Sequence, residues 1–262
     1  MKVLFLGDIV GKPGRQAVKH ILPKLIERYR PDVVIANAEN SAGGTGIEPR
    51  IAEELFGYGV SVITLGNHVW QRKTVFHYLD TERARIIRPV NFPPGVPGAG
   101  VTTIDLPSGR SLAVVNAIGR VFMPQLADCP FQAMDRVLDS LPESVTAIFV
   151  DFHAEATSEK QAMGFYLAGR VSAVVGTHTH VQTADERILP RGTAYISDVG
   201  MCGPRDSILG VDPDIGLERF TQSYSKRFEL AKGAREVDGV VIDIDDQSGQ
   251  ALAIQRVVES LL

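Results

Sequence analysis

The chain has 262 residues, of which 44% are hydrophobic and 22% are charged, and its formal net charge is −4. This composition provides enough apolar residues for a sizeable core, and we expect a single domain over residues 1–262. The acidic balance excludes a broad basic surface, so long duplex nucleic acid is not an expected partner.

Short apolar runs rich in β-branched residues predict strands that are buried on both faces. The first of these runs cover residues 3–6, 33–36, 60–65, 112–116, 147–150 and 171–175. Between the first two, residues 15–30 carry an apolar stripe with helical spacing, and Pro23 inside it predicts a kink or a break. Residues 51–58 and 131–141 are further predicted helices. The alternation of strands and helices favours an α/β layered fold.

The later segments have a different pattern. Strands are predicted at residues 100–106, 193–197, 239–244 and 251–257 without long helices between them, which suggests a second, more antiparallel sheet. Residues 89–98 contain four prolines and two glycines and are typical of a surface loop. Residues 201–236 match no clear element, and a lid, an insertion or an interface between subunits of a homo-oligomer would each fit them.

The cysteines and the hydropathy of the chain together predict in which cellular compartment the protein lies. Cys129 and Cys202 lie far apart without a CxxC motif, which suits a reducing environment. The apolar run at residues 3–6 is too short for a signal peptide, and no run approaches the roughly 18–20 residues of a membrane span. We therefore expect a cytoplasmic protein with no membrane partner.

Five patches of metal-binding side chains each come at or just after a predicted strand. They are Gly-Asp at residues 7–8, Asn-Ala-Glu-Asn at 37–40, Gly-Asn-His at 66–68, Asp-Phe-His at 151–153 and Gly-Thr-His-Thr-His at 176–180. Ligands often gather where strand ends converge on one edge of a sheet. The mixture of carboxylates, amides and imidazoles suits iron, manganese or zinc better than calcium.

Each candidate ligand has an ordinary structural interpretation when it is taken alone. An aspartate after a strand is usually a turn or cap residue, and a single buried histidine is usually only hydrogen-bonded. His178 and His180 are stronger candidates, because residues two apart in an extended segment point to the same side. The ordered combination of five patches predicts a metal site, and the turn at residues 40–44 could also bind an oxyanion through successive amides.

The ordered pattern resembles that of the calcineurin-like metallophosphoesterases, and the longer strings are similar to the YmdB-like bacterial branch. These strings are Gly-Asp-Ile-Val-Gly at residues 7–11, Ala-Asn-Ala-Glu-Asn at 36–40, Gly-Thr-His-Thr-His-Val at 176–181 and Ser-Asp-Val-Gly-Met at 197–201. The resemblance implies a four-layer α/β/β/α sandwich with two metal ions, iron first and manganese or zinc as alternatives. The implied ligands are Asp8 and His180 for one metal, Asn67, His153 and His178 for the other, and Glu39 as the bridge.

The sequence departs from the wider superfamily at two positions. The first motif is usually Asp-x-His, but Val10 stands where that histidine is expected. The bridging residue is usually an aspartate, whereas here it is Glu39, which is one methylene longer. Asn40, beside the bridge, is the nearest candidate to complete the first metal's ligands.

The resemblance implies a dinuclear phosphodiesterase that hydrolyses small phosphodiesters, with cyclic nucleotides (2′,3′ or 3′,5′) as the substrate class. We expect in-line attack by a hydroxide that bridges the metals, and His68 resembles the family's proton donor to the leaving group. Two alternatives remain: a phosphomonoesterase or protein phosphatase, and a metal-binding regulatory protein that acts by binding. A structural metal site is a weaker interpretation, because such zinc sites are typically cysteine-rich.

Overall fold

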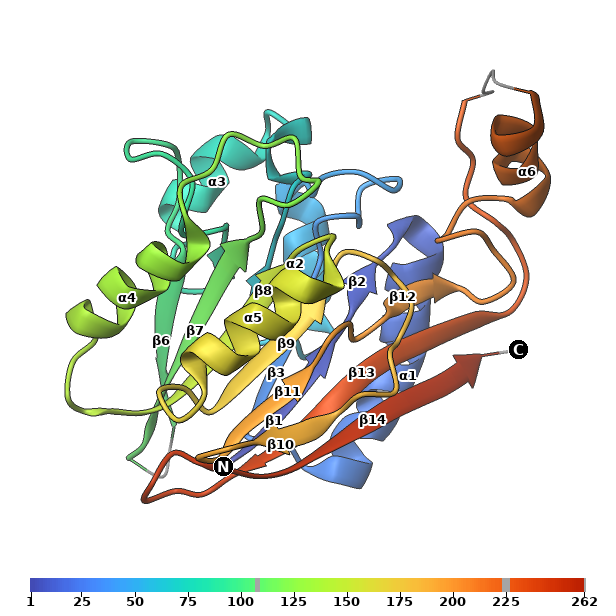
Figure 1. Ribbon diagram of the computed structural model, residues 1–262. Helices are drawn as coiled ribbons and strands as arrows, with labels where there is room; N and C mark the ends of the chain where they lie inside the picture. Colours follow the sequence, from blue (N-terminus) through green and yellow to red (C-terminus); the bar gives the residue numbers. More distant parts are fainter. Residues whose placement is uncertain (107–108, 223–226, 262) are drawn as a thin grey trace.

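The alternation of side chains along the first apolar run explains the layering of the molecule. Strand β1 (Lys2–Leu6) sends Val3 and Phe5 into one core and Leu4 and Leu6 into another. Every one of these four side chains is fully buried, as expected for a strand covered on both faces. The structure is a computed structural model and describes residues 1–106, 109–222 and 227–261 (Figure 1).

The first sheet has eight strands among the described residues, in the order β2-β12-β13-β1-β3-β4-β5, with β14 paired to β13. Besides β1, the strands are β2 (Asp8–Ile9), β3 (Val33–Asn37), β4 (Val62–Thr64), β5 (Ile86–Ile87), β12 (Met201–Pro204), β13 (Arg235–Ile244) and β14 (Ala251–Leu261). Strand β1 is parallel to β3 and antiparallel to β13, so segments from both ends of the chain share this sheet.

The second sheet has six strands in the described part of the chain, in the order β10-β11-β9-β8-β7-β6. They are β6 (Val101–Asp105), β7 (Ser111–Ile118), β8 (Val145–His153), β9 (Ala173–Thr177), β10 (Arg187–Leu189) and β11 (Thr193–Ile196). Strands β7, β8, β9 and β11 run parallel to their neighbours in this set, so their carboxyl ends meet at one edge.

Helices cover the outer face of each sheet and complete four layers (Figure 1). One core joins the first sheet to α1 (Gly11–Tyr29) and α2 (Pro49–Gly57), a second lies between the sheets, and a third joins the second sheet to α4 (Pro130–Ser140) and α5 (Thr157–Leu167). The remaining helical elements are η1 (Val69–Gln71), α3 (Val75–Thr81) and α6 (Pro213–Gln222). The predicted α/β/β/α sandwich is confirmed.

Three expectations from the sequence need correction or completion. Helix α1 continues through Pro23, so there is no break there. The later strands do not form a separate antiparallel sheet, because β13 and β14 join the first sheet while β6 and β11 join the second, and both sheets are mixed. Helix α5 was not predicted, since its apolar residues do not form a clear helical stripe.

The unassigned stretch at residues 201–236 begins as a strand of the first sheet and then leaves the sandwich. After β12 it makes short bridges between Ile208 and Val211 and between Val211 and Leu230, and it carries α6 beyond the end of the sheet (Figure 1). Residues 223–226 lie outside the described residues. No helix in the described part of the chain is long and apolar enough to cross a membrane.

Candidate metal centre

The predicted ligands come from both sheets and meet at the ends of the strands. Asp8 begins β2, while Glu39, Asn40 and Asn67 follow β3 and β4 of the first sheet. His153 ends β8, and His178 and His180 follow β9 of the second sheet. Asp8, Glu39, Asn40 and His153 are buried, and the other three side chains are half-buried.

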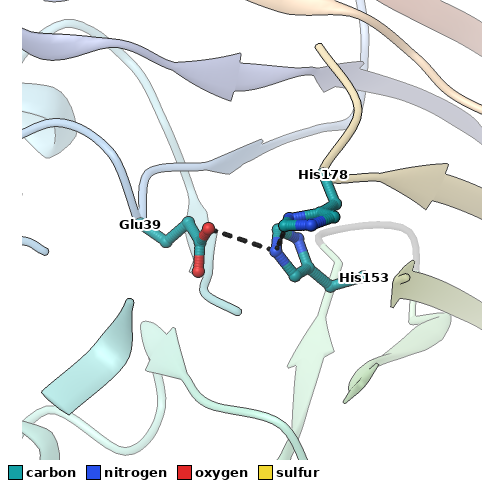
Figure 2. Close-up of side chains that lie close together, drawn as sticks. All are labelled: Glu39, His153 and His178. Carbon is teal, nitrogen blue, oxygen red and sulfur yellow. Dashed lines mark hydrogen bonds and ion pairs between the residues drawn. The ribbon is translucent and has the colours of Figure 1, made fainter. Parts of the chain in front are cut away.

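Nε2 of His153 lies at the centre of one half of this group. It is 2.7 Å from Oδ1 of Asn67, 3.1 Å from Nδ1 of His178 and 3.1 Å from Oε1 of Glu39. Figure 2 shows the Glu39 carboxylate, from the first sheet, pointing toward the two imidazole rings of the second. Ligand atoms of Glu39, His153 and His178 all lie within 4.8 Å of one another, a spacing that a single cation can span.

The donor set fits a metal ion. Oε1 of Glu39 is buried and lies 3.1 Å from Nε2 of His153 without a well-aligned hydrogen bond among the described residues, although a buried carboxylate oxygen normally requires a donor or a cation. Only glycine fits at position 66 beside this carboxylate. A Cβ atom at Gly66 would lie 2.5 Å from Oε2 of Glu39 and 2.4 Å from Cδ2 of His153. Two imidazoles, a carboxylate and an amide oxygen are ligands that suit a first-row transition metal.

The electrostatics of this half also favour a positive charge beside Glu39. Burial alone would raise the pKa of Glu39, but the nearby charge of His153 lowers this pKa to about 2. Burial would lower the pKa of His153, yet Glu39 raises it to about 9. Burial and the neighbouring His153 lower the pKa of His178 to about 3. The group therefore contains an ionised carboxylate whose charge is balanced by the proton on His153, and a divalent cation bound there would take the place of that proton.

A hydrogen-bonded chain behind His153 holds its ring in place. Nδ1 of His153 is 2.9 Å from Oγ1 of Thr177, and this hydroxyl donates to Oδ1 of Asp151 at 2.7 Å. Asp151 also accepts hydrogen bonds from Thr64 and from the Asn37 amide, both on the first sheet. Burial raises the pKa of Asp151 to about 6. The Asp151 carboxyl thus ties the two sheets together directly behind the candidate ligands.

The other half of the group is arranged around Asn40. Its Nδ2 lies 3.1 Å from Nε2 of His180 and donates to Oδ1 of Asp8 at 3.4 Å. The Nε2 atom of His180 is 3.8 Å from the same Asp8 oxygen, and its Nδ1 atom is 3.2 Å from the carbonyl oxygen of Leu209. Burial raises the pKa of Asp8 despite the nearby histidines. Asn40 thus lies beside Asp8 and His180, the two ligands that the resemblance implies for the first metal, while Val10 lies against Gly203 and Gly210.

Two local expectations about the backbone are wrong. Strand β9 ends at Thr177, and the φ angles of His178 and His180 are 102° and 63°, so these histidines do not share one side of an extended segment. Each instead reaches a different half of the group. In the turn at residues 40–44, the amides of Ser41 and Gly44 donate to the carbonyl oxygens of Ala38 and Asn40, so they are not available to an oxyanion.

His68 lies beside the group and makes one clear contact with it. Its backbone N–H donates to Oε2 of Glu39 at 2.8 Å, and its Nδ1 atom is buried without a hydrogen-bond partner in the described part of the chain. His68 is therefore next to the bridge candidate, and its half-buried ring keeps one nitrogen without a partner among the described residues.

Sequence reasoning missed several supporting residues. Glu155 contacts Nε2 of His178 at 3.1 Å, and the Leu209 carbonyl contacts His180, but neither carries a recognisable motif. Asp151 and Thr177 were inside the patches, yet nothing in their spacing revealed the hydrogen-bonded chain to His153. The one available signal was the position of Asp151, a carboxylate two residues before His153 at the end of a buried strand.

Comparison with known proteins gives a consistent family. The model of the family described as YmdB-like protein matches residues 4–257. A Bacillus subtilis protein named 2′,3′-cyclic-nucleotide 2′-phosphodiesterase is 50% identical over 258 residues, covering 98% of this chain and 97% of that protein.

Two solved structures share the whole fold. One is a protein of Thermus thermophilus described as hypothetical, with 42% identity, a TM-score of 0.92 and 99% coverage of both chains. The other is described as a novel phosphatase from Mycoplasma pneumoniae, with 34% identity and a TM-score of 0.92, covering 99% of this chain and 93% of that one.

Proposed function

This chain belongs to the YmdB-like protein family, and on that premise we propose that it is a metal-dependent phosphodiesterase acting on 2′,3′-cyclic nucleotides. The observation that carries the proposal is the convergence of Asn67, His178 and Glu39 on Nε2 of His153, at distances of 2.7–3.1 Å. The substrate class comes from the name of the Bacillus subtilis relative, which is 50% identical along almost its whole length.

We assign the ligand roles from the two halves of the group. Asn67, His153 and His178 would hold one metal, Asp8, Asn40 and His180 would hold the other, and Glu39 would bridge them. Iron, manganese or zinc fits these donors. Bound divalent ions would supply an activated water and positive charge for the phosphoryl oxygens, which is the usual contribution of a two-metal site.

The chain's own residues would then orient and protonate the substrate. Asp151 and Thr177 orient His153, and the Leu209 carbonyl orients His180, so that each ring presents Nε2 to the centre. His68 is the proposed proton donor to the departing ribose oxygen. Its free, buried Nδ1 and its position beside Glu39 support this role.

The test compares hydrolysis of bis-p-nitrophenyl phosphate, adenosine 2′,3′-cyclic phosphate and p-nitrophenyl phosphate by the purified protein. We expect both diesters to be cleaved, with activity lost on chelation and restored by iron, manganese or zinc. Preference for the monoester would favour the phosphatase alternative, a class named for the Mycoplasma pneumoniae structure. Failure to cleave any ester while metal is bound would favour the regulatory alternative.

Three broader expectations remain proposals. Cys129 and Cys202 form no disulfide, which supports a reducing compartment such as the cytoplasm. The shared core between the two sheets supports a single domain. Exposed apolar side chains on α6, Leu217 and Phe220, support association into a homo-oligomer.

A further inference from the structure

A pocket of about 360 Å³ adjoins the candidate ligands at His180, which contributes to its lining. One side is the glycine-rich turn at residues 43–45 together with Arg72. The opposite side is the segment that carries α6, which contributes Leu209, Arg227 and Phe228. The pocket therefore lies between the end of the sandwich and the segment that projects from it, and its volume is typical of small-molecule sites.

The pocket is positively charged although the whole chain is acidic. Arg72 and Arg227 line it, and no carboxylate among the described residues does. The Arg72 guanidinium donates to the carbonyl oxygens of Thr45 and Ala42 at 3.2 and 2.7 Å. Because both acceptors are neutral, these bonds hold the guanidinium in position without cancelling its charge. Such a pocket favours an anionic ligand.

The pocket is also apolar on the side of the projecting segment. Leu209, Val211, Phe228 and Leu230 contribute to it, and the Phe228 side chain is 51% exposed. Leu230 packs tightly over Gly11, where a Cβ atom would lie only 2.1 Å from its Cδ1. A ligand with one flat apolar part and one anionic part would therefore match both sides.

We propose that this pocket holds the nucleobase and ribose of the cyclic nucleotide, with Phe228 stacking on the base. The inference rests on the proposed function and extends it, because a phosphate held at His180 would place the rest of a nucleotide next to this pocket. A larger hollow of about 760 Å³ elsewhere is lined by Asp32, Asp243, Asp245 and Asp246, so it would repel a phosphate.

The experiment compares two cyclic phosphates that differ in the base. Adenosine 2′,3′-cyclic phosphate carries a base and ribose, while glycerol 1,2-cyclic phosphate has the same strained ring without them. We expect Phe228→Ala to reduce the ratio of kcat/KM for the adenosine compound to that for the glycerol compound by about tenfold, the scale of losing one stacking contact. The matched control is Phe165→Ala on α5, a phenylalanine that is 54% exposed and does not line this pocket.

A binding measurement separates this inference from the proposed function. Calorimetric titration with adenosine 3′-monophosphate should show about tenfold weaker binding to the Phe228→Ala variant, whereas Phe165→Ala should bind as the wild type does. If the wild type cleaves neither cyclic phosphate, the proposed function fails and the titration alone decides the pocket. An unchanged substrate ratio together with unchanged nucleotide binding in Phe228→Ala would overturn the inference.

Discussion

The two halves of the candidate centre are built differently. Around His153, three donor atoms converge on Nε2 of its ring, and a hydrogen-bonded chain through Thr177 to Asp151 supports the ring from behind. Around His180, the amide of Asn40 lies between the imidazole and Asp8, and a backbone carbonyl supports the ring. The first half contains a buried carboxylate oxygen without a hydrogen-bond partner among the described residues, which favours a bound cation. In the second half, hydrogen bonds already satisfy many of the polar side chains.

This difference has a consequence for metal affinity. Ligands whose orientation is determined by buried partners lose little freedom on binding, while a half held by Asn40 must exchange hydrogen bonds for ligand bonds. We therefore expect the His153 half to bind metal more tightly than the His180 half. Val10, which stands where the superfamily pattern has a histidine, belongs to the His180 half, for which we expect the weaker metal binding.

The largest effect should come from removing the central imidazole. His153→Ala should lower kcat by about a thousandfold or more, beyond the effect of losing an outer partner, and should reduce the bound metal measured by elemental analysis. The companion variant, His180→Ala, should lose metal from the other half only and retain at least half of the wild-type content. Full metal content in both variants would contradict the expectation that the two halves differ in metal affinity.

At His68, which supports neither half as a ligand, we expect an effect on kcat but none on metal content. His68→Ala should lower kcat by about 10²–10⁴-fold by removing the proton donor, with the metal content unchanged. The control is His77→Ala, an exposed histidine away from the group. Loss of metal in His68→Ala equal to that in His153→Ala would contradict a separate proton-donor role.

The smallest effect on metal binding is expected at Thr177, which supports the His153 ring without being a candidate ligand. Thr177→Val removes the hydroxyl between His153 and Asp151 and should weaken metal binding in that half by about 10–100-fold. Thr193→Val is the matched control, since its hydroxyl also makes a buried hydrogen bond in the second sheet, to Val171, far from the ligands. Equal metal affinity in the two variants would show that the Thr177 chain does not tune the centre.

Local patterns predicted most of the strands and the ligand candidates, whereas the four-layer arrangement was implied by the family resemblance. Alternation along β1 and donors at strand ends are readable in short windows. The assignment of His178 and His180 to different halves depends on left-handed backbone angles after β9, which spacing does not reveal. The Asn37 contact to Asp151 joins residues 114 positions apart, and the Leu209 carbonyl comes from a segment without a clear pattern.

The origin of the ligands in two different sheets has a consequence for the lifetime of the protein. Asp8, Glu39 and Asn67 belong to one sheet, while the three histidines from β8 and β9 belong to the other. A metal bound by residues of both sheets would link the two sheets and would stabilise only the folded chain. A shortage of metal would therefore not only abolish activity. It would also increase the fraction of unfolded molecules, which proteases degrade.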